Sequence, residues 1–445
     1  MLSIVCALCC AVAFVALGDA RAQLGPALSL LVLWGFAVWA APKPAGGPAR
    51  VLLVALLIRA VLLLAPLSLS DDLYRYLWEG RVVTWGGNPY SHPPSWEGWP
   101  PDPIRALVNH KEIPTIYPPV AMAMFAGFAA VYYDPITPRV AFGLCDALLA
   151  GALALTLRGR GRRLDAAWLY ALHPLGAVEA AGSGHLDAAA LLGLVLAVLG
   201  WDRATRRGRG DAGVTAAVLG AGVKLFPALL LPALLRAPGP RRARGVALAA
   251  SGALVLALSA PFWDAGAGLT FAFRNYVSHW SFNGSLFPLL ERGVLALGGP
   301  VLLARRLGVL AGGIVVAGAL WRRRDPAEVA LWAGGAFVLL SPTVHPWYVT
   351  LAWVPALLCG VRAWTLLATA APIAYAVLAT LDPATGRWQE PEWTRPLIYL
   401  PFLALLLAEW CWRQIRAGPW LASACADGSA SPCPTTPAPS TARAP

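Results

Sequence analysis

The feature that most limits what this chain can fold into is a succession of long apolar runs. Runs of about 16 to 20 apolar residues recur from Met1 to about Trp412, each close to the length that a helix needs to cross a bilayer. The chain is 58% hydrophobic and 13% charged, whereas a soluble domain carries about 25% charged residues. The sequence therefore predicts an all-α polytopic membrane protein with about 12 to 14 spans and no sizeable soluble domain.

The net charge of +12 does not indicate a nucleic-acid-binding protein, because the basic residues stand in short clusters between apolar runs. Such clusters are typical of loops on the cytoplasmic side of a membrane protein. We therefore expect no nucleic-acid partner, contacts with membrane lipids, and an internal position for the clusters at 158–163, 203–209, 236–244 and 322–324.

This orientation implies outward spans that include 51–69, 166–181 and 364–381, and it places two long loops, 70–138 and 263–300, on the external face. The apolar stretch 120–133 in the first loop is too short to cross the membrane, so we expect an interfacial or re-entrant helix there. The stretch 213–235 lies between two internal clusters, which predicts two short helices broken near Lys224. We expect a membrane domain over 1–418 and a disordered tail, rich in Pro, Ala, Ser and Thr, over 419–445.

The N-terminal run at 2–18 has two interpretations. A second apolar run follows it at once, over 24–41, which favours a retained helical hairpin. The alternative is a signal peptide with a cleavage-like site at 20–22, although the run lacks a basic start.

The densest group of polar residues is the stretch 70–81, which directly follows an outward span. It contains Asp71 and Asp72 at the membrane boundary, where partial desolvation raises the pKa and the basicity of a carboxylate. Either one is therefore a candidate general base for a lipid-borne substrate. The alternative is that an aspartate caps the following helix while its aromatic residues form an interfacial belt.

Further candidates follow along the external face. Glycine and proline fix the rest of the first loop, so its polar and aromatic side chains either bind a sugar or belong to a merely rigid loop: Asn88, Tyr90, His110, Lys111, Glu112 and Tyr117.

Three later positions complete the set of candidates. His185 and Asp187, at an external helix start, can hold a divalent cation (Mg or Mn) together with Asp71 or Asp72, can orient one another, or can leave Asp187 as a helix cap. Lys224 interrupts an apolar stretch, so it either binds a phosphate or extends to the interface without a role. His345 stands between prolines and aromatic residues, as expected for a sugar-phosphate site or for simple interfacial anchoring.

Several motifs together resemble the GT-C superfamily of glycosyltransferases. They are Asp-Asp-Leu-Tyr-Arg-Tyr-Leu-Trp-Glu-Gly from 71, Gly-Gly-Asn-Pro-Tyr from 86, His-Lys-Glu-Ile-Pro-Thr-Ile-Tyr-Pro-Pro from 110, Gly-His-Leu-Asp from 184 and His-Pro-Trp-Tyr from 345. The chain is most similar to glycosyltransferase family 87 and to bacterial polyprenol-phosphate mannosyltransferase-like proteins, over about residues 50–415.

The resemblance implies a hexosyltransferase, of mannose in particular, that uses a polyprenyl-phosphate sugar as donor and a lipid or glycan as acceptor. It implies an active site on the periplasmic face of a bacterial inner membrane, with Asp71 or Asp72 as base. His345 would lie near the donor phosphate, and Asp187 would match an acid that binds metal in some of these enzymes.

The expected reaction is inverting sugar transfer. The base takes a proton from an acceptor hydroxyl, and polyprenyl phosphate leaves with its charge met by Lys224, His345 or the arginines Arg75 and Arg81. A transporter or flippase of a lipid-linked or anionic solute is the main alternative, but it would place ionisable residues within spans, where Asp146 is the clearest case. A scaffold protein that binds only lipid is a third possibility.

Overall fold

The computed structural model describes residues 1–208, 211–382 and 388–417. Within these residues the chain forms twenty α-helices and no β-strand, apart from isolated bridges that join Phe282 and Asn283 to Thr343. The prediction of an all-α polytopic protein is confirmed. The predicted tail over 419–445 lies outside the described residues.

The first half of the chain begins with three apolar helices, continues with three shorter helices, and then alternates longer helices with short ones. In order these are α1 (Leu2–Ala16), α2 (Leu24–Ala40), α3 (Pro48–Leu62), α4 (Asp72–Thr84), α5 (Pro103–Leu107), α6 (Pro119–Val131), α7 (Ile136–Gly159), α8 (Asp165–Leu172), α9 (Pro174–Ala177), the π-helical turn η1 (Val178–Gly182), α10 (Asp187–Arg207), α11 (Asp211–Val223), the 3₁₀ turn η2 (Phe226–Leu230) and α12 (Leu231–Leu235).

The second half alternates long helices with short 3₁₀ segments. These elements are α13 (Arg241–Ser259), η3 (Ala260–Ala265), α14 (Gly268–His279), α15 (Phe287–Ala296), α16 (Val301–Arg322), α17 (Pro326–Leu340), η4 (Pro346–Val349), α18 (Thr350–Cys359), α19 (Ala363–Ala370), η5 (Ala371–Thr380) and α20 (Thr394–Ala417).

Six helices of the described chain are long and apolar enough to cross a membrane. They cover Ile136–Gly159, Asp187–Arg207, Arg241–Ala265, Val301–Arg322, Ala363–Thr380 and Thr394–Ile415. Shorter apolar helices of 10 to 17 residues accompany them, among them α1, α2 and α17. The total of 12 to 14 spans stays a prediction, because these short helices would have to complete it.

Two stretches that we predicted to be continuous spans do not form single helices. The predicted span over 166–181 breaks at His173, whose Nδ1 accepts the N–H of Leu175 beside Pro174, and it ends in the π-helical turn η1. The predicted span over 51–69 ends as a helix at Leu62. The predicted break near Lys224 is confirmed, since α11 ends at Val223 and η2 begins at Phe226.

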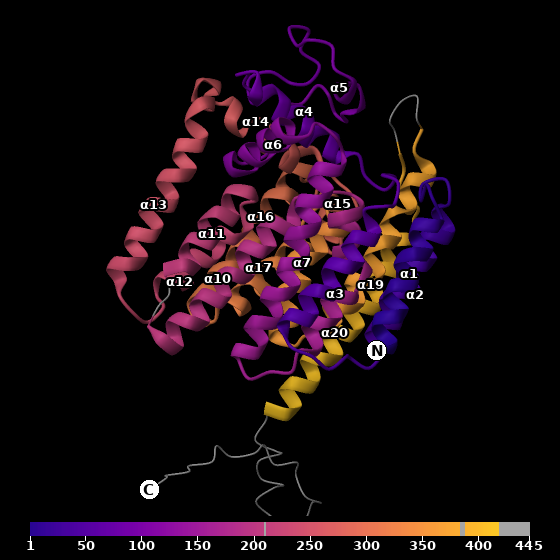
Figure 1. The fold of residues 1–445 in the computed structure, drawn as a ribbon, viewed down its shortest axis with the longest axis vertical. Helices are drawn as coiled ribbons and strands as arrows, with labels where there is room; N and C mark the ends of the chain where they lie inside the picture. The colour runs from indigo at the N-terminus through magenta and orange to yellow at the C-terminus, as the bar shows by residue number, and fades with distance from the viewer. Residues whose placement is uncertain (209–210, 383–387, 418–445) are drawn as a thin grey trace, which may run out of the picture.

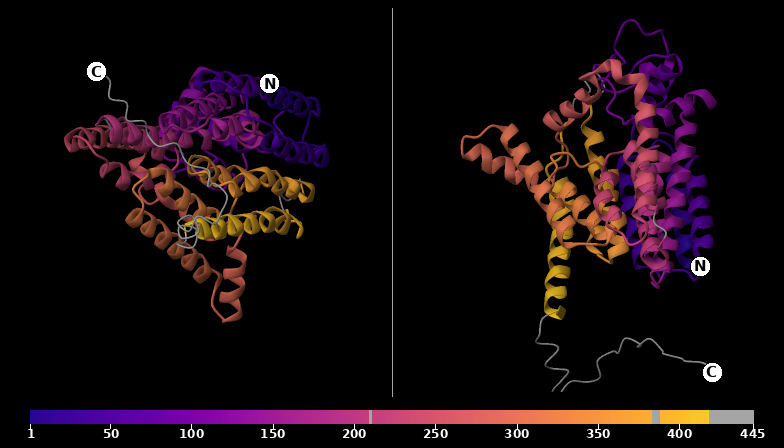
Figure 2. Two further views of the ribbon diagram at one scale, coloured as in Figure 1. Left: turned by 90° about the horizontal axis from the view of Figure 1, so that it is seen from below. Right: turned by 90° about the vertical axis from the view of Figure 1, so that its left-hand side faces the viewer.

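The helices are arranged as a bundle with a cap of short helices at one end (Figure 1). The cap holds α4, α5 and α6, so the first long loop does contain short helices, and α14 lies nearby. Helix α13 stands apart from the bundle in Figure 1, and α15 with the start of α16 projects sideways in Figure 2. Helices α13 and α16 are hardly buried within the protein, so their apolar sides are left for lipid.

Close approach of backbones holds two helices of the cap together. Helix α4 lies on α6 at Gly80, where a Cβ atom would stand 2.0 Å from the carbonyl oxygen of Phe125. Glycine is therefore required at this crossing, because any side chain would separate the two helices. The fully buried rings of Tyr76 and Phe125 stack 4.6 Å apart beside it.

Two arginines form ion pairs between elements that are distant in sequence; those of Arg59 are buried and those of Arg160 are partly buried. Arg59 on α3 donates from Nε and Nη2 to Asp146 on α7, at 2.8 and 2.6 Å, so the mid-span acid already has a cation partner. At the other end of α7, Arg160 donates to both Asp202 and Asp325, with distances between 2.8 and 3.0 Å. This arginine clasp connects α7, α10 and the start of α17.

Candidate active site

A large cavity of about 1520 Å³ lies between the cap and the bundle. One end is polar, and its wall includes Asp71, Asp72, Asp187, Lys224 and His345. The other end is apolar and is lined by η2, α16 and α17, through residues such as Phe226, Leu229, Val309, Val316, Ala333 and Phe337. Charged and apolar side chains therefore line the same cavity.

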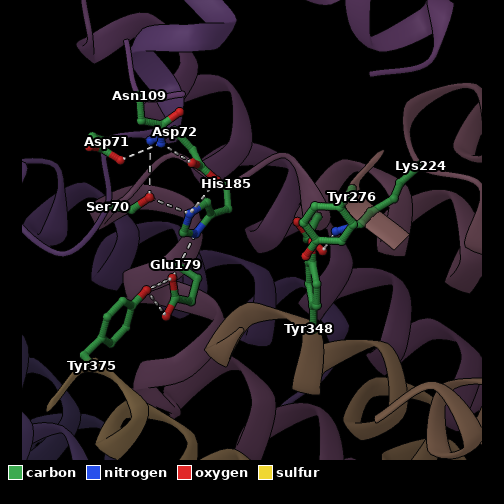
Figure 3. A network of polar contacts seen from close by, with 11 residues as sticks. Ser70, Asp71, Asp72, Asn109, Glu179, His185, Lys224, Tyr276, Tyr348 and Tyr375 are labelled. Atoms are coloured by element: carbon green, nitrogen blue, oxygen red, sulfur yellow. Dashed lines mark hydrogen bonds and ion pairs between the residues drawn. The ribbon is translucent and has the colours of Figure 1, made fainter. Parts of the chain in front are cut away.

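Asp71 and Asp72 share one hydrogen-bond donor at the polar end. Nδ2 of Asn109 lies 2.9 Å from Oδ1 of Asp71 and 3.1 Å from Oδ1 of Asp72 (Figure 3). Burial and the neighbouring Asp72 raise the pKa of Asp71, and the Asn109 bond opposes that rise. Asp71 stands at the N-cap of α4, but its side chain makes no capping bond, so the helix does not occupy this carboxylate.

The loop that carries Asn109 is fixed by a buried arginine. Arg75 donates to the backbone carbonyls of Asn109, His110 and Ile113, at 2.6, 2.7 and 3.0 Å, and to Glu79 Oε1 at 3.2 Å. Arg75 borders the cavity, but the described hydrogen bonds of its guanidinium hold the loop and are not directed at a phosphate site.

Glu79 is the second anchor of this loop. Its Oε2 accepts the hydroxyl of Thr115 at 2.7 Å, and burial raises the pKa of Glu79 to about 7 although Arg75 opposes the rise. Glu79 is 1% exposed, so its charge is costly without both partners.

Lys224 is not the isolated cation that the sequence suggested. Its Nζ lies 2.5 Å from Oδ1 of Asp187 and 4.2 Å from the ring centre of Tyr348. The hydroxyl of Tyr348 is 3.1 Å from that of Tyr276 on α14. The ammonium still borders the cavity, where it can meet an anion from the side that Asp187 leaves open.

His185 and Asp187 take different partners and do not orient one another. His185 contacts Glu179 through Nδ1 and Ser70 through Nε2, while Asp187 pairs with Lys224. Both ring nitrogens are therefore engaged, and the described residues contain no group of three or more His, Cys, Asp or Glu side chains placed to hold a metal. A Mg or Mn site that includes His185 or Asp187 stays a prediction.

His345 borders the cavity in a segment held by a short backbone pairing. The N–H of Val344 donates to the carbonyl of Phe282 at 2.8 Å, and Asn283 Nδ2 donates to the carbonyl of Val344 at 3.1 Å. The ring of His345 stacks on Trp347 with 4.5 Å between centroids. Burial lowers the pKa of His345 to about 4, so it faces the cavity as an uncharged hydrogen-bonding group.

The remaining predicted residues divide into two sets. Four of the substrate-loop candidates line the cavity: Tyr90, His110, Glu112 and Tyr117. The structure does not bring the other three to it. Arg81 lies over the ring of Tyr133, Asn88 donates to Asp264 at 2.5 Å, and Lys111 donates to the carbonyl of Ala106 at 2.8 Å.

Sequence patterns did not single out several polar residues of the site. Asn109 precedes a motif that we noted, but an asparagine in a loop gives no sign that it will bridge two carboxylates. Glu179 and Tyr375 lie in apolar stretches that we interpreted as spans, and they meet only through the fold, at 2.9 to 3.0 Å. The sequence did offer one signal for these two residues, because an acid or a phenol within a predicted span is unusual.

Comparison with known proteins gives one match. A family model described as alpha-(1->6)-mannopyranosyltransferase, N-terminal domain, matches residues 2–238, just over half of the chain. Neither the curated proteins nor the solved structures gave a match. The matched segment contains Asp71, Asp72, Asn109 and Lys224, whereas His345 lies beyond it.

Proposed function

The chain belongs to the alpha-(1->6)-mannopyranosyltransferase family, and from this premise we propose that it moves a mannosyl unit from a polyprenyl-phosphate donor to a lipid or glycan acceptor. The observation that carries the proposal is the carboxylate pair Asp71 and Asp72, which share Asn109 in the wall of a cavity that is polar at one end and apolar at the other. The cavity shape suits a substrate with a sugar-phosphate head and a hydrocarbon tail.

In the proposed reaction a carboxylate of the pair takes the proton of an acceptor hydroxyl as its oxygen attacks the anomeric carbon of mannose. The new C–O bond forms while the bond from that carbon to the phosphate oxygen breaks. Polyprenyl phosphate leaves with the electron pair and needs no proton, so one base is sufficient. Inversion yields an α linkage from a β-linked donor, and the family description points to a 6-hydroxyl as acceptor.

The leaving phosphate needs positive charge or hydrogen-bond donors at the polar end. Lys224 supplies a cation, and His345, uncharged because of its lowered pKa, supplies a hydrogen-bond donor. Burial of Asp71 and the nearby charge of Asp72 raise the pKa of Asp71, so the pair takes up a proton more readily. The apolar lining on η2, α16 and α17 would hold the first isoprene units.

The position in the cell follows from charge. The arginine clusters after α7, α10 and α16 belong on the cytoplasmic side. The site would then face the periplasm of a bacterial inner membrane, where a lipid-linked donor brings activated sugar without nucleotides.

The test uses purified protein in lipid vesicles with radiolabelled polyprenyl-phosphate mannose and a mannoside acceptor. Asp71→Asn and Asp72→Asn are assayed separately, with Glu97→Gln, an exposed acid of the same loop outside the cavity, as the matched control. At least one aspartate variant should lose transfer by about 10²-fold or more, and the control should not. Full activity in both aspartate variants would overturn the mechanism, and solute uptake without any glycosyl product would favour a transporter.

A further inference from the structure

Behind Asp72, a chain of polar side chains runs from the cavity wall into the bundle. Ser70 Oγ is 3.0 Å from His185 Nε2, and His185 Nδ1 is 2.9 Å from Glu179 Oε2 (Figure 3). The hydroxyl of Tyr375 donates to both oxygens of Glu179, at 3.0 and 2.9 Å. The proposed mannosyl transfer gives none of these groups a role.

The contacts of the His185 ring select its tautomer. A carboxylate accepts hydrogen bonds, so the ring hydrogen lies on Nδ1 and points at Glu179. Nε2 then accepts the hydroxyl of Ser70, whose oxygen in turn accepts the backbone N–H of Asp72 at 3.3 Å. The basic nitrogen of the ring therefore faces the cavity side, and Oδ2 of Asp72 is 3.9 Å from it.

Burial distinguishes the two ends of this series of hydrogen-bonded side chains. The side chain of Asp72 is 30% exposed, whereas His185 is 1% exposed and Glu179 is 4% exposed. Trp347 covers the imidazole at a centroid distance of 3.7 Å. Hydrogen bonds and charge interactions are strong in such a low-dielectric setting, and the π-helical turn that carries Glu179 is a rare element often found at functional sites.

We propose that His185 is a proton-relay and positioning residue for Asp72, and that Asp72 is therefore the base of the pair. The inference rests on the proposed function. The acceptor O–H bond breaks and its proton goes to Oδ2 of Asp72. After a small rotation of the exposed Asp72 side chain, the proton passes to Nε2 of His185, and Glu179 balances the imidazolium. Asp72 is again a carboxylate, and after product release the proton returns through it to cavity water.

Transfer of the proton from Asp72 to His185 opposes the reverse reaction. A protonated Asp72 beside the new glycosidic oxygen could return the proton as a general acid, which is the reverse reaction by microscopic reversibility. Removal of the proton to His185 leaves a carboxylate there instead. Asp71 has no comparable histidine among its described neighbours, which include Asn109, the carboxylate of Asp72 and the charge of Arg21.

Polar and charged groups face His185 from several elements of the bundle. They are Ser70 and Asp72 at the start of α4, Glu179 on η1, Tyr375 on η5, Trp347 with His345 behind it at η4, Asp187 on α10, and Asp146 with Arg59 on α7 and α3.

The experiment compares His185→Gln with the unaltered protein in vesicles, using the mannosyl transfer assay over a range of pH. Glutamine can keep a hydrogen bond to a neighbour but cannot take up the proton. The relay predicts a loss of kcat on the order of 10²-fold with little change in the KM of the donor, together with a changed acid limb of the pH–rate profile. If the role of His185 were only structural, His185→Gln would not change the acid limb of the pH–rate profile and would not lower kcat while the KM of the donor stayed the same.

Two further variants provide the controls. His173→Gln alters another fully buried histidine, one that contacts Thr369 and does not border the cavity, and it should leave the pH–rate profile unchanged. Tyr375→Phe keeps the ring and removes the donor to Glu179, so it remains informative if His185→Gln fails to fold. It should lower kcat severalfold and shift the same limb.

The outcomes separate the two proposals. Absence of mannosyl transfer by the unaltered protein contradicts the proposed function. The relay alone is overturned if the unaltered protein transfers mannose and Asp72→Asn is inactive, but His185→Gln keeps kcat to within about twofold. Loss of activity in Asp71→Asn but not in Asp72→Asn also overturns the relay, because the base would then be the carboxylate without a histidine behind it.

Discussion

The ammonium of Lys224 lies 2.5 Å from Oδ1 of Asp187, so the lysine that breaks an apolar stretch is tied to the acid that begins α10. Asp187 is 4% exposed, and its Oδ2 has no hydrogen-bond partner. The pair therefore anchors the turn between α11 and η2 against α10 while one side of the ammonium borders the cavity.

Lys224→Met should destabilise the protein by about 2 kcal/mol, because it leaves a buried carboxylate unpaired. The double variant with Asp187→Asn should regain most of that loss, since both charges are then absent. Thermal unfolding of the single and double variants completes the cycle. Lys224→Met should also raise the KM for the donor, and the double variant should keep this raised KM. A return to the original KM would show that Lys224 does not bind the donor phosphate.

Asn109→Ala should shift the acid limb of the pH–rate profile to higher pH. The Asn109 bond stabilises the charged form of Asp71 and opposes the rise in its pKa. Without that bond the carboxyl pair binds its proton up to a higher pH, so the base is active over a narrower range. Kinetics across the acid range measure the shift, and an unmoved limb would show that the bond does not act on the base.

Glu79→Gln should remove a pH dependence of stability. The pKa of Glu79 is raised to about 7 in the folded chain, so the folded state binds more protons than the unfolded state between the ordinary and the raised pKa. Its contribution is full below the ordinary pKa and falls as the pH rises through about 7, by up to about 3 kcal/mol. Tryptophan fluorescence during thermal unfolding from about pH 5 to about pH 8 should show a decline that the variant lacks.

Gly80→Ala should be more damaging than other glycine changes in the cap. A Cβ there meets the carbonyl oxygen of Phe125 at 2.0 Å, so α4 must move from α6, at a cost of about 3 kcal/mol. Gly127→Ala on α6 is the matched control, since a Cβ there meets no atom within 4 Å, and it should be neutral or slightly stabilising. Equal unfolding midpoints for the two variants would contradict the close crossing.

His345→Phe should raise the KM of the donor more than His345→Gln does. Burial lowers the pKa of His345 to about 4, so the ring is uncharged at neutral pH and acts through a hydrogen bond that glutamine can replace. The donor KM should therefore show no inflection near the ordinary histidine pKa. An inflection there that disappears in His345→Gln would mean that the ring acts as a cation instead.

Patterns along the chain revealed the all-α class, the helix from Asp72, the short helix over 120–133 and the break at Lys224. Each of these depends on local signals, namely run length, a proline and a charge within an apolar stretch. The early end of the helix at Leu62 and the π-helical turn after Ala177 were missed, because apolar periodicity continues across both.

The candidate site was predictable in its residue types and much less in its partners. The residues Asp71, Asp72, Asp187, Lys224 and His345 all border one cavity, and the reason for selecting each was a polar group beside an apolar run. That Lys224 pairs with Asp187, or that Arg75 holds the loop of Asn109, depends on contacts 34 to 38 residues apart in sequence. No local pattern encodes such distances.

The arginine clasp has a consequence for any attempt to divide the protein. The segment that matches the family model ends at residue 238, yet Arg160 within it is held partly by Asp325, which lies beyond it. In the same way Glu179 needs Tyr375. A recombinant fragment that stopped at 238 would leave Arg160 without one of its two acids and Glu179 without its phenol, so expression and mutational libraries should treat both parts as one cooperative folding unit.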